Sequence, residues 1–357
     1  MLDGKRKSVE PMAARLGVPR QNLGHFVGQS SWDYIEVMRT VAGRALADLA
    51  PTAWIIDDHP LVRYGHDTAG AARQHCGERG QHLCQVAVSV HAVCACGSAP
   101  LYWRLFLPRA WAEDAPRCAK AGIPAGLGHR TKPQIALELL DELAAWGQSP
   151  PLIVADAAYG VSVAFRAGLT ERHIPWLMAV NEDTTVIAAT GAPVTAWARR
   201  RPEPTGVAQV AEPHRYRARR FVYRAKNASH HARSGWFLAL RVHIAGWPER
   251  RHINNTSRDR LLPERTLLVQ WRRKHGGEIA RSWITDLPAD TPLSVLVHHA
   301  TDRWHIETDY REMEQALGLG DYEGRGYNGL HHHLALVSAA HLFCLEQCHN
   351  PNDPATT

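Results

Sequence analysis

The 357-residue sequence predicts an α/β protein, in which a mixed sheet carries helices on its faces, a helical segment precedes the sheet and a β-rich insertion interrupts it. Three observations support this fold class. Short apolar runs alternate with helical patterns between Pro51 and Asn181, strand-like runs joined by basic turns fill residues 183–287, and residues 1–50 show helical spacing. A chain of this length can form two or three structural units.

The N-terminal segment, residues 1–50, is predicted to form three short helices between Ser8 and Leu49. The first ends at Gly17, a residue typical of helix C-caps, and Trp32 opens the third. The apolar residues whose spacing would pack two helices at a steep angle are Ala13, Leu16, Leu23 and Phe26. A DNA-binding helix-turn-helix and a plain helical bundle both fit this spacing.

The central sheet is predicted within residues 51–182, and residues 288–349 return to it. The apolar run Trp54-Ile55-Ile56 stops at Asp57-Asp58, and the strand-like runs CQVAVSVHAV and PLYWRLFLP follow. Next come a helix near Ile135, the buried-type strand PLIVADAAYG, a second helix and the strand PWLMAV. The order of three strands, helix, strand, helix and strand is that of an RNase H-like sheet.

Two acids follow apolar strands of this predicted sheet. Asp57 comes directly after the first strand, and Asp156 comes after the strand PLIVA. Side chains at the ends of neighbouring strands project into one crevice, so we expect these two carboxylates to lie together. Asp58 is the neighbouring alternative to Asp57.

A third acid lies on a predicted helix from Thr301 to Leu319. Residues at intervals of three and four share a face of a helix, and on this helix that face is charged. Its members are Arg303, Glu307, Arg311 and Glu314. The helix can therefore pack on a core while it presents Glu307 toward a cleft or toward solvent.

Three clustered carboxylates repel one another unless a cation joins them. The set Asp57, Asp156 and Glu307 therefore predicts a divalent metal site with two Mg²⁺ ions, or Mn²⁺ in their place. Two such ions roughly 3.5–4 Å apart activate a nucleophilic oxygen and stabilise the leaving oxygen of a phosphodiester. The sequence thus indicates phosphoryl-transfer chemistry on nucleic acid.

Composition fits this chemistry without requiring it. The net charge is +6, and six of the 41 basic residues are lysines, which leaves 35 arginines. Arginine binds phosphate through a planar fork, although a GC-rich genome gives the same bias. The sequence has no apolar run long enough for a membrane span and no secretory signal, so we expect a cytoplasmic protein. Seven scattered cysteines make a disulfide framework unexpected.

Several segments resemble the DDE transposases of bacterial insertion sequences, in the branch with a YREK signature and closest to the insertion-sequence 701 group. They include IIDDHPLVRYGHDTAG, CQVAVSVHAV, LYWRLFLPRAWAED, IVADAAYG and DRWHIETDYREMEQALGLG. The resemblance implies an RNase H-like domain with a β-strand insertion and a Mg²⁺ cofactor. It also implies cleavage of transposon ends, joining to target DNA, a homodimer on DNA and association with the bacterial nucleoid.

Carried over onto this sequence, the resemblance assigns catalysis and metal binding to Asp57, Asp156 and Glu307, with Arg303 as a phosphate clamp. The signature's tyrosine and lysine fall at Ala300 and Glu314, so two usual phosphate contacts are replaced. The residues predicted to contact DNA are Arg63, Arg303, Arg311, Trp236, Trp271, Arg272 and Arg273. Arg63 would substitute for a lost phosphate contact, and the tryptophans would stack on an extruded base.

Two other functions remain open from the sequence. Relatives usually carry more helical sequence before the RKSVEPMAARLG segment, so the chain is also compatible with a truncated, catalytically impaired remnant that binds DNA. A metal-dependent nuclease of the same fold would cut DNA without joining it to a target.

Overall fold

The computed structural model describes residues 7–76, 80–189, 205–224, 232–244 and 263–349. The chain forms two compact units. The first comprises Met1–Thr52, Ile56–Ser149 and His305–Thr357, and the second comprises Ala53–Ile55 and Pro150–Trp304. None of the helices within the described ranges is long and apolar enough to cross a membrane.

The first unit begins with the three helices that the sequence predicts. They are α1 (Val9–Leu16), α2 (Arg20–Gly28) and α3 (Tyr34–Leu49). Gly17 caps α1 with a φ of 65°, the left-handed conformation that glycine adopts at least cost. The long C-terminal helix α12 (Tyr327–His349) contacts both α2 and α3.

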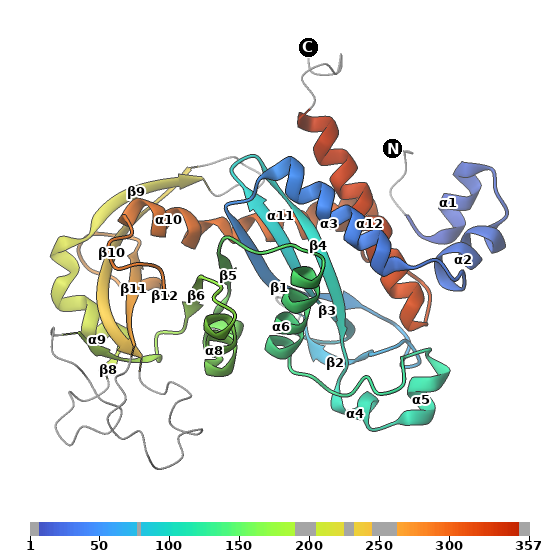
Figure 1. The fold of residues 1–357 in the computed structure, drawn as a ribbon, viewed down its shortest axis with the longest axis horizontal. Coiled ribbons are helices and arrows are strands. Elements are labelled where there is room, and N and C mark those ends of the chain that lie inside the picture. Colours follow the sequence, from blue (N-terminus) through green and yellow to red (C-terminus); the bar gives the residue numbers. More distant parts are fainter. Residues whose placement is uncertain (1–6, 77–79, 190–204, 225–231, 245–262, 350–357) are drawn as a thin grey trace. The chain divides into compact units, whose positions relative to one another are not determined.

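The sheet of the first unit contains β1 (Ala53–Val62) from Ile56 onward, β2 (Ala72–His75), β3 (Gln81–Cys94) and β4 (Gly97–Phe106). β3 pairs antiparallel with β2 and β4 (Figure 1). Arg63 N donates to Leu83 O at one end of the β1–β3 pair, and Thr52 N donates to Val93 O at the other. Residue numbers therefore run in opposite senses, so β1 and β3 are antiparallel.

The faces of this sheet are covered by different helices. Ser89 and Trp103 are register partners on one face, where Trp103 donates to Ser338 of α12 and Ser89 contacts Tyr310 of α11 (Trp304–Glu312). On the other face Arg104 pairs with Glu138 of α6 (Lys132–Ala145). Two short helices, α4 (Arg109–Ala112) and α5 (Ala115–Lys120), complete the unit.

The second unit is organised around β5 (Ile153–Ala155) and β6 (Trp176–Val180), which are parallel. α7 (Ala157–Gly160) and α8 (Val163–Glu171) connect them, as the sequence predicts for a crossover. Trp54 of β1 donates its N–H to Leu152 O beside β5. β6 also pairs antiparallel with β12 (Ile279–Thr285), so the insertion continues the same sheet.

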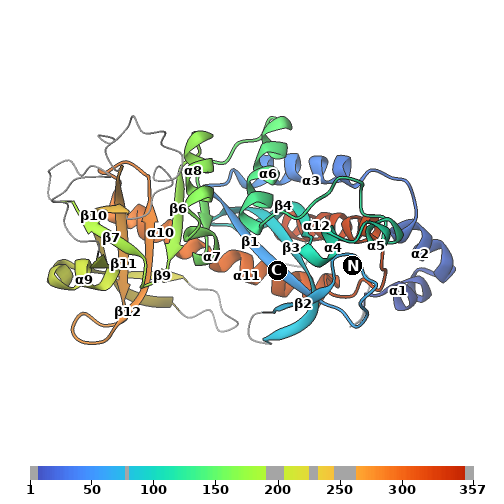
Figure 2. The same cartoon turned by 90° about the horizontal axis from the view of Figure 1, so that it is seen from below.

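The remaining insertion strands follow β12 in the order β11 (Glu264–Trp271), β10 (Ala232–Ile244), β7 (Thr185–Ala188) and β8 (Thr205–Gly206). β9 (Arg219–Arg224) pairs with β10. α9 (Val207–Ala211) and the 3-10 helix η2 (Glu212–Arg217) precede β9. α10 (Leu293–Asp302) lies against β6, β9 and β10 (Figure 2).

Three expectations from the sequence are wrong. Strand β1 does not end at Asp57 but continues to Val62, because its pairing with β3 continues. The helix expected over Thr301–Leu319 is divided into the end of α10, α11 and a π-helical turn, η4 (Met313–Leu317). Finally, Cys94 and Cys96 form a disulfide at the β3–β4 turn.

Candidate functional site

Two predicted acids of the first unit lie on elements that face each other. Asp57 is a buried residue of β1, and Glu307 is an exposed residue of α11. His59 shares the Asp57 side of β1, because alternate residues of a strand point the same way. Its ring lies 4.3 Å from the Tyr310 ring, and its Nε2 lies 3.0 Å from Oε1 of Glu314. The Asp57 side of β1 therefore faces α11 and η4.

The direction of α11 brings Asp57 and Glu307 to the same end of this contact. Ser89 bonds Tyr310 and His91 bonds Asp309, so α11 runs antiparallel to β3. Since β1 is also antiparallel to β3, α11 and β1 run the same way. Asp57 precedes His59 on β1, and Glu307 precedes Tyr310 on α11. Because the two elements run the same way, both acids lie toward the N-terminal end of the contact between β1 and α11.

Asp58 has different surroundings from Asp57. Its side chain points to the opposite face of β1, where Lys132 Nζ lies 2.6 Å from its Oδ2. Lys132 is the first residue of α6, whose start is fixed by a capping box between Thr131 and Gln134. This ion pair occupies Asp58 on the α6 face, so of the two neighbouring acids only Asp57 is directed toward α11.

Helix α11 is fixed to the sheet by a buried carboxylate next to Glu307. Asp309 accepts hydrogen bonds from His91 Nδ1 at 2.8 Å and Ser98 Oγ at 2.6 Å. Burial alone would raise the pKa of Asp309, but the hydrogen bond from His91, together with the one from Ser98, outweighs burial and lowers the pKa. Burial lowers the pKa of His91. A neutral His91 imidazole therefore donates to an ionised Asp309 carboxylate.

Asp156 belongs to the second unit and caps α7. Its Oδ1 accepts from the backbone N–H groups of Ala158 and Tyr159 at 2.9 and 3.3 Å, which fixes the carboxylate directly after β5. Its Oδ2 lies 3.7 Å from the guanidinium of Arg303. Gly160 packs so closely that a Cβ would lie 1.8 Å from Ala179 O, so only glycine fits behind this acid.

The chemistry of these acids fits a hard divalent cation, which prefers carboxylate oxygens. Asp57 and Glu307 offer two carboxylates from facing elements, and Asp156 keeps Oδ2 directed away from its capping bonds. Within the described ranges, no group of three or more His, Cys, Asp or Glu side chains is already gathered as a metal site.

Comparison with known proteins identifies the family of this chain. Residues 1–236, about two thirds of the chain, match the family described as DDE superfamily endonuclease. The chain belongs to this family. A similar relative is the "Probable transposase for insertion sequence element IS701" of Microchaete diplosiphon, 30% identical over 187 residues. That match covers 51% of this chain and 46% of the relative, so the chain spans about half the length of this curated relative.

Membership of the DDE superfamily endonucleases implies dependence on a divalent metal, generally Mg²⁺. The RNase H-like prediction agrees with the mixed sheet and its flanking helices.

Two residues predicted to contact DNA lie inside the protein. Arg63 of this DDE endonuclease is buried, and it donates to Gln85 Oε1 at 2.6 Å and to the carbonyls of Val62 and Gly320. Burial lowers its pKa to about 10, so it stays charged at neutral pH. Trp271 is fully buried under the Arg215 guanidinium. Because both side chains are buried, neither can contact DNA in this conformation.

The other predicted DNA contacts are accessible. Arg311 is exposed on α11, and Arg272 and Arg273 are exposed in the turn after β11. Trp236 is half-buried, with Lys274 Nζ 5.1 Å above its ring. In the strand register, Trp236 of β10 lies opposite Arg220 of β9 on one side and Trp271 of β11 on the other. The three strands and the turn that follows β11 therefore lie together at one end of the insertion sheet.

We call this end the basic edge. Its exposed residues are Tyr216, Arg217, Arg219, Arg220, Arg272 and Arg273. Arg215 organises it, because its guanidinium donates to the carbonyls of Arg273, Gly276 and Gly277 and pairs with Glu212. Two positive-φ glycines, Gly276 and Gly277, let the turn present those carbonyls. The sequence pattern did not identify Arg215 or the 72% exposed Tyr216.

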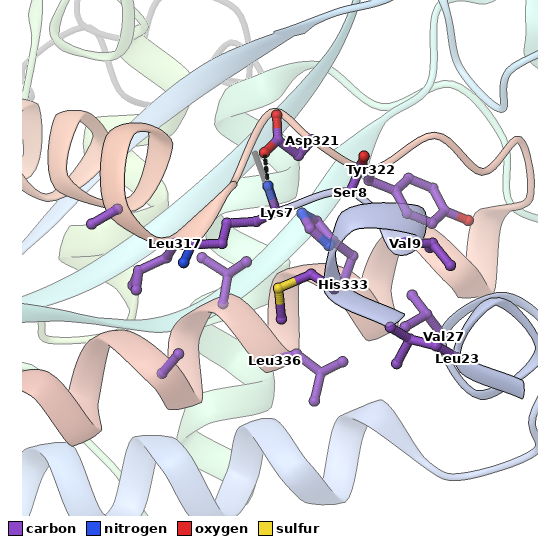
Figure 3. Close-up of a pocket in the computed structure, with 14 residues that line it drawn as sticks. Lys7, Ser8, Val9, Leu23, Val27, Leu317, Asp321, Tyr322, His333 and Leu336 are labelled. Carbon is purple, nitrogen blue, oxygen red and sulfur yellow. Dashed lines mark hydrogen bonds between the residues drawn. The ribbon is translucent and has the colours of Figure 1, made fainter. Parts of the chain in front are cut away.

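The N-terminal helices enclose a separate pocket of about 290 Å³ in the first unit (Figure 3). Its wall is mainly apolar, with Val9 and Leu23 from α1 and α2 and Leu336 from α12. Asp321 accepts a hydrogen bond from the backbone N–H of Lys7 at its rim. An apolar wall of this kind stabilises the packing of α1 and α2, and none of the predicted catalytic acids lines it.

Proposed function

We propose that this DDE endonuclease is a transposase, which cleaves DNA at transposon ends and joins the freed 3′-OH to target DNA. One observation carries the proposal: Asp57 of β1 and Glu307 of α11 lie at the same end of the contact between these two elements. The relative named for insertion sequence element IS701 supports the same activity.

In this proposal Asp57, Asp156 and Glu307 bind two Mg²⁺ ions, for which Mn²⁺ can substitute. When bound, the ions activate the attacking oxygen and stabilise the leaving oxygen of the phosphodiester. The backbone N–H groups of Ala158 and Tyr159, which donate to Asp156, hold its carboxylate in a fixed orientation after β5. Arg303 neutralises Asp156 before metal and DNA bind, and then serves as a phosphate contact.

DNA binding is assigned to three regions of the chain. The basic edge offers arginine forks for backbone phosphates, with Tyr216 and Trp236 as aromatic surfaces beside them. Arg311 adds a cation on the exposed face of α11. The helices of residues 1–50 are the third region. We further propose that the protein acts as a homodimer on its DNA ends.

The proposal is tested by incubating the protein with its flanking terminal repeats and Mg²⁺ and by scoring nicks and joined products separately. Asp57→Asn, Asp156→Asn and Glu307→Gln should each abolish both products, while binding of DNA in Ca²⁺ persists. Asp58→Asn is the matched control, because Lys132 already pairs with that acid, and it should retain cleavage.

The outcomes separate the alternative functions. Nicks without joined products would identify a nuclease, and DNA binding without nicks by the wild-type protein would identify a catalytically inactive DNA-binding protein. Cleavage at the wild-type rate by Asp156→Asn would disprove the assignment of the three acids.

A further inference from the structure

The pair His59 and Glu314 joins the strand and the helix that carry two of the proposed metal ligands. His59 Nε2 lies 3.0 Å from Glu314 Oε1, and the His59 side chain is 12% exposed. The Glu314 side chain is 46% exposed, so one side of the carboxylate rests on β1 while the other meets solvent. The resemblance in sequence places a lysine at this position, and a lysine would attract phosphate where Glu314 repels it.

The His59 ring is held from its other side as well. It packs against the Tyr310 ring, tilted by 31° with the ring centroids 4.3 Å apart, and the Tyr310 hydroxyl bonds Ser89 Oγ of β3 at 2.7 Å. The contacts therefore run from β3 through Tyr310 to His59 of β1 and on to Glu314. Because Tyr310 is one turn after Glu307, this series of contacts restrains the turn that carries Glu307.

The backbone around Glu314 is itself fixed. Glu314 lies in the π-helical turn η4, which widens the helix after α11. Met313 is fully buried beneath it, and its carbonyl accepts from Leu319 N at 3.0 Å. Gly318 ends the turn with a φ of 75°. The backbone of this turn therefore orients the Glu314 carboxylate toward His59 of β1.

We propose that Glu314 and His59 are a positioning pair, which holds α11 against β1 and so sets Glu307 relative to Asp57, and that Glu314 is not a DNA contact. The proposal rests on the assignment of Asp57 and Glu307 as metal ligands. It explains why an acid stands where the resemblance predicts a lysine: the side chain at this position binds the protein rather than the substrate.

The test is a double-mutant cycle on the full-length protein without DNA, with Mn²⁺ affinity measured by calorimetry. Glu314→Ala and His59→Phe each remove one partner, and phenylalanine keeps a ring for Tyr310. Each single change should weaken Mn²⁺ binding about threefold to tenfold, the size of one net hydrogen bond, and the double change should be no worse than either. Glu314→Gln keeps an acceptor oxygen and should restore most of the affinity.

Glu312→Gln is the matched control. It removes one negative charge two residues away, at the last residue of α11, where the Glu312 side chain is 63% exposed and lies 3.9 Å from His341. Mn²⁺ affinity should not change in this variant. Circular dichroism melting confirms that each variant is folded, and the partial exposure of Glu314 makes truncation tolerable.

DNA binding as a function of salt distinguishes the positioning role from a DNA contact. The log-log salt slope of Glu314→Ala should equal that of the wild type. A slope changed by about 0.9, the value of one phosphate contact, together with unchanged Mn²⁺ affinity would place Glu314 at the DNA and overturn the proposal.

Two further results separate this inference from the proposed function. If the losses of Mn²⁺ affinity in the two single variants add up in the double variant, while Asp57→Asn still abolishes Mn²⁺ binding, the positioning pair is wrong but the ligand assignment stands. Unchanged Mn²⁺ binding in Asp57→Asn would overturn the ligand assignment and the positioning role with it.

Discussion

At the scale of single residues, the adjacent acids Asp57 and Asp58 differ because a strand directs neighbours to opposite faces. Asp57 is directed toward α11, whereas Asp58 meets Lys132 at the start of α6. The sequence alone left the two acids as alternatives, since both follow the same apolar run. The partner that separates them lies 74 residues away, and no local pattern identifies it.

This difference predicts an energetic coupling between Asp58 and Lys132. Lys132→Met and Asp58→Asn should each lower the free energy of unfolding by about 1 kcal/mol, because the pair is partly shielded from solvent. The double variant should lose no more than one single variant, as measured by urea unfolding. Fully additive losses would show that the 2.6 Å contact contributes nothing to stability.

At the scale of elements, the sequence predicted those helices and strands that are determined by residues within or next to the segment itself. Apolar runs identified β3 and β4, the capping box of Thr131 and Gln134 starts α6, and Gly17 ends α1. Elements that depend on distant partners were missed. β2, with the sequence ARQH, has no apolar pattern and forms because β3 pairs with it. The continuation of β1 beyond Asp57 likewise depends on β3.

The turn between β11 and β12 is also held by a residue far away in the sequence, Arg215, and this contact predicts an effect on DNA binding. Arg215→Met would leave the carbonyls of Arg273, Gly276 and Gly277 without their donor, at a cost of about 1–3 kcal/mol. The turn should loosen, so DNA affinity should fall although Arg215 is buried.

The exposed arginines of the same turn should act differently. Replacing Arg272 and Arg273 by alanine should flatten the log-log salt dependence of DNA binding by about 1.8, or two phosphate contacts, without loss of stability. Binding titrations at several salt concentrations measure both effects. An unchanged slope would assign these two arginines to solubility rather than to DNA.

At the scale of the whole molecule, α12 connects the N-terminal helices to the sheet of the first unit, and a neutral histidine lies in that contact. α12 packs on α2, α3 and β4. His331 is buried between the rings of Tyr34 and Tyr327, and its Nδ1 bonds Tyr327 O. The imidazole has no room for a hydration shell, so a proton on His331 destabilises the folded state and favours unfolding or loosening of α12.

This burial predicts how stability depends on pH. It lowers the pKa of His331 to about 4, below the value of about 6.5 in an unfolded chain. Between these values the unfolded state binds more protons, so the free energy of unfolding falls as pH drops from about 6.5 toward 4. The slope approaches roughly 1.4 kcal/mol per pH unit for this one group. His331→Gln keeps an N–H donor for Tyr327 O but cannot titrate. Urea unfolding from pH 7 to pH 5 should therefore show a shallower pH dependence in His331→Gln than in the wild type, whereas parallel curves would mean that His331 already reaches solvent when the protein is folded.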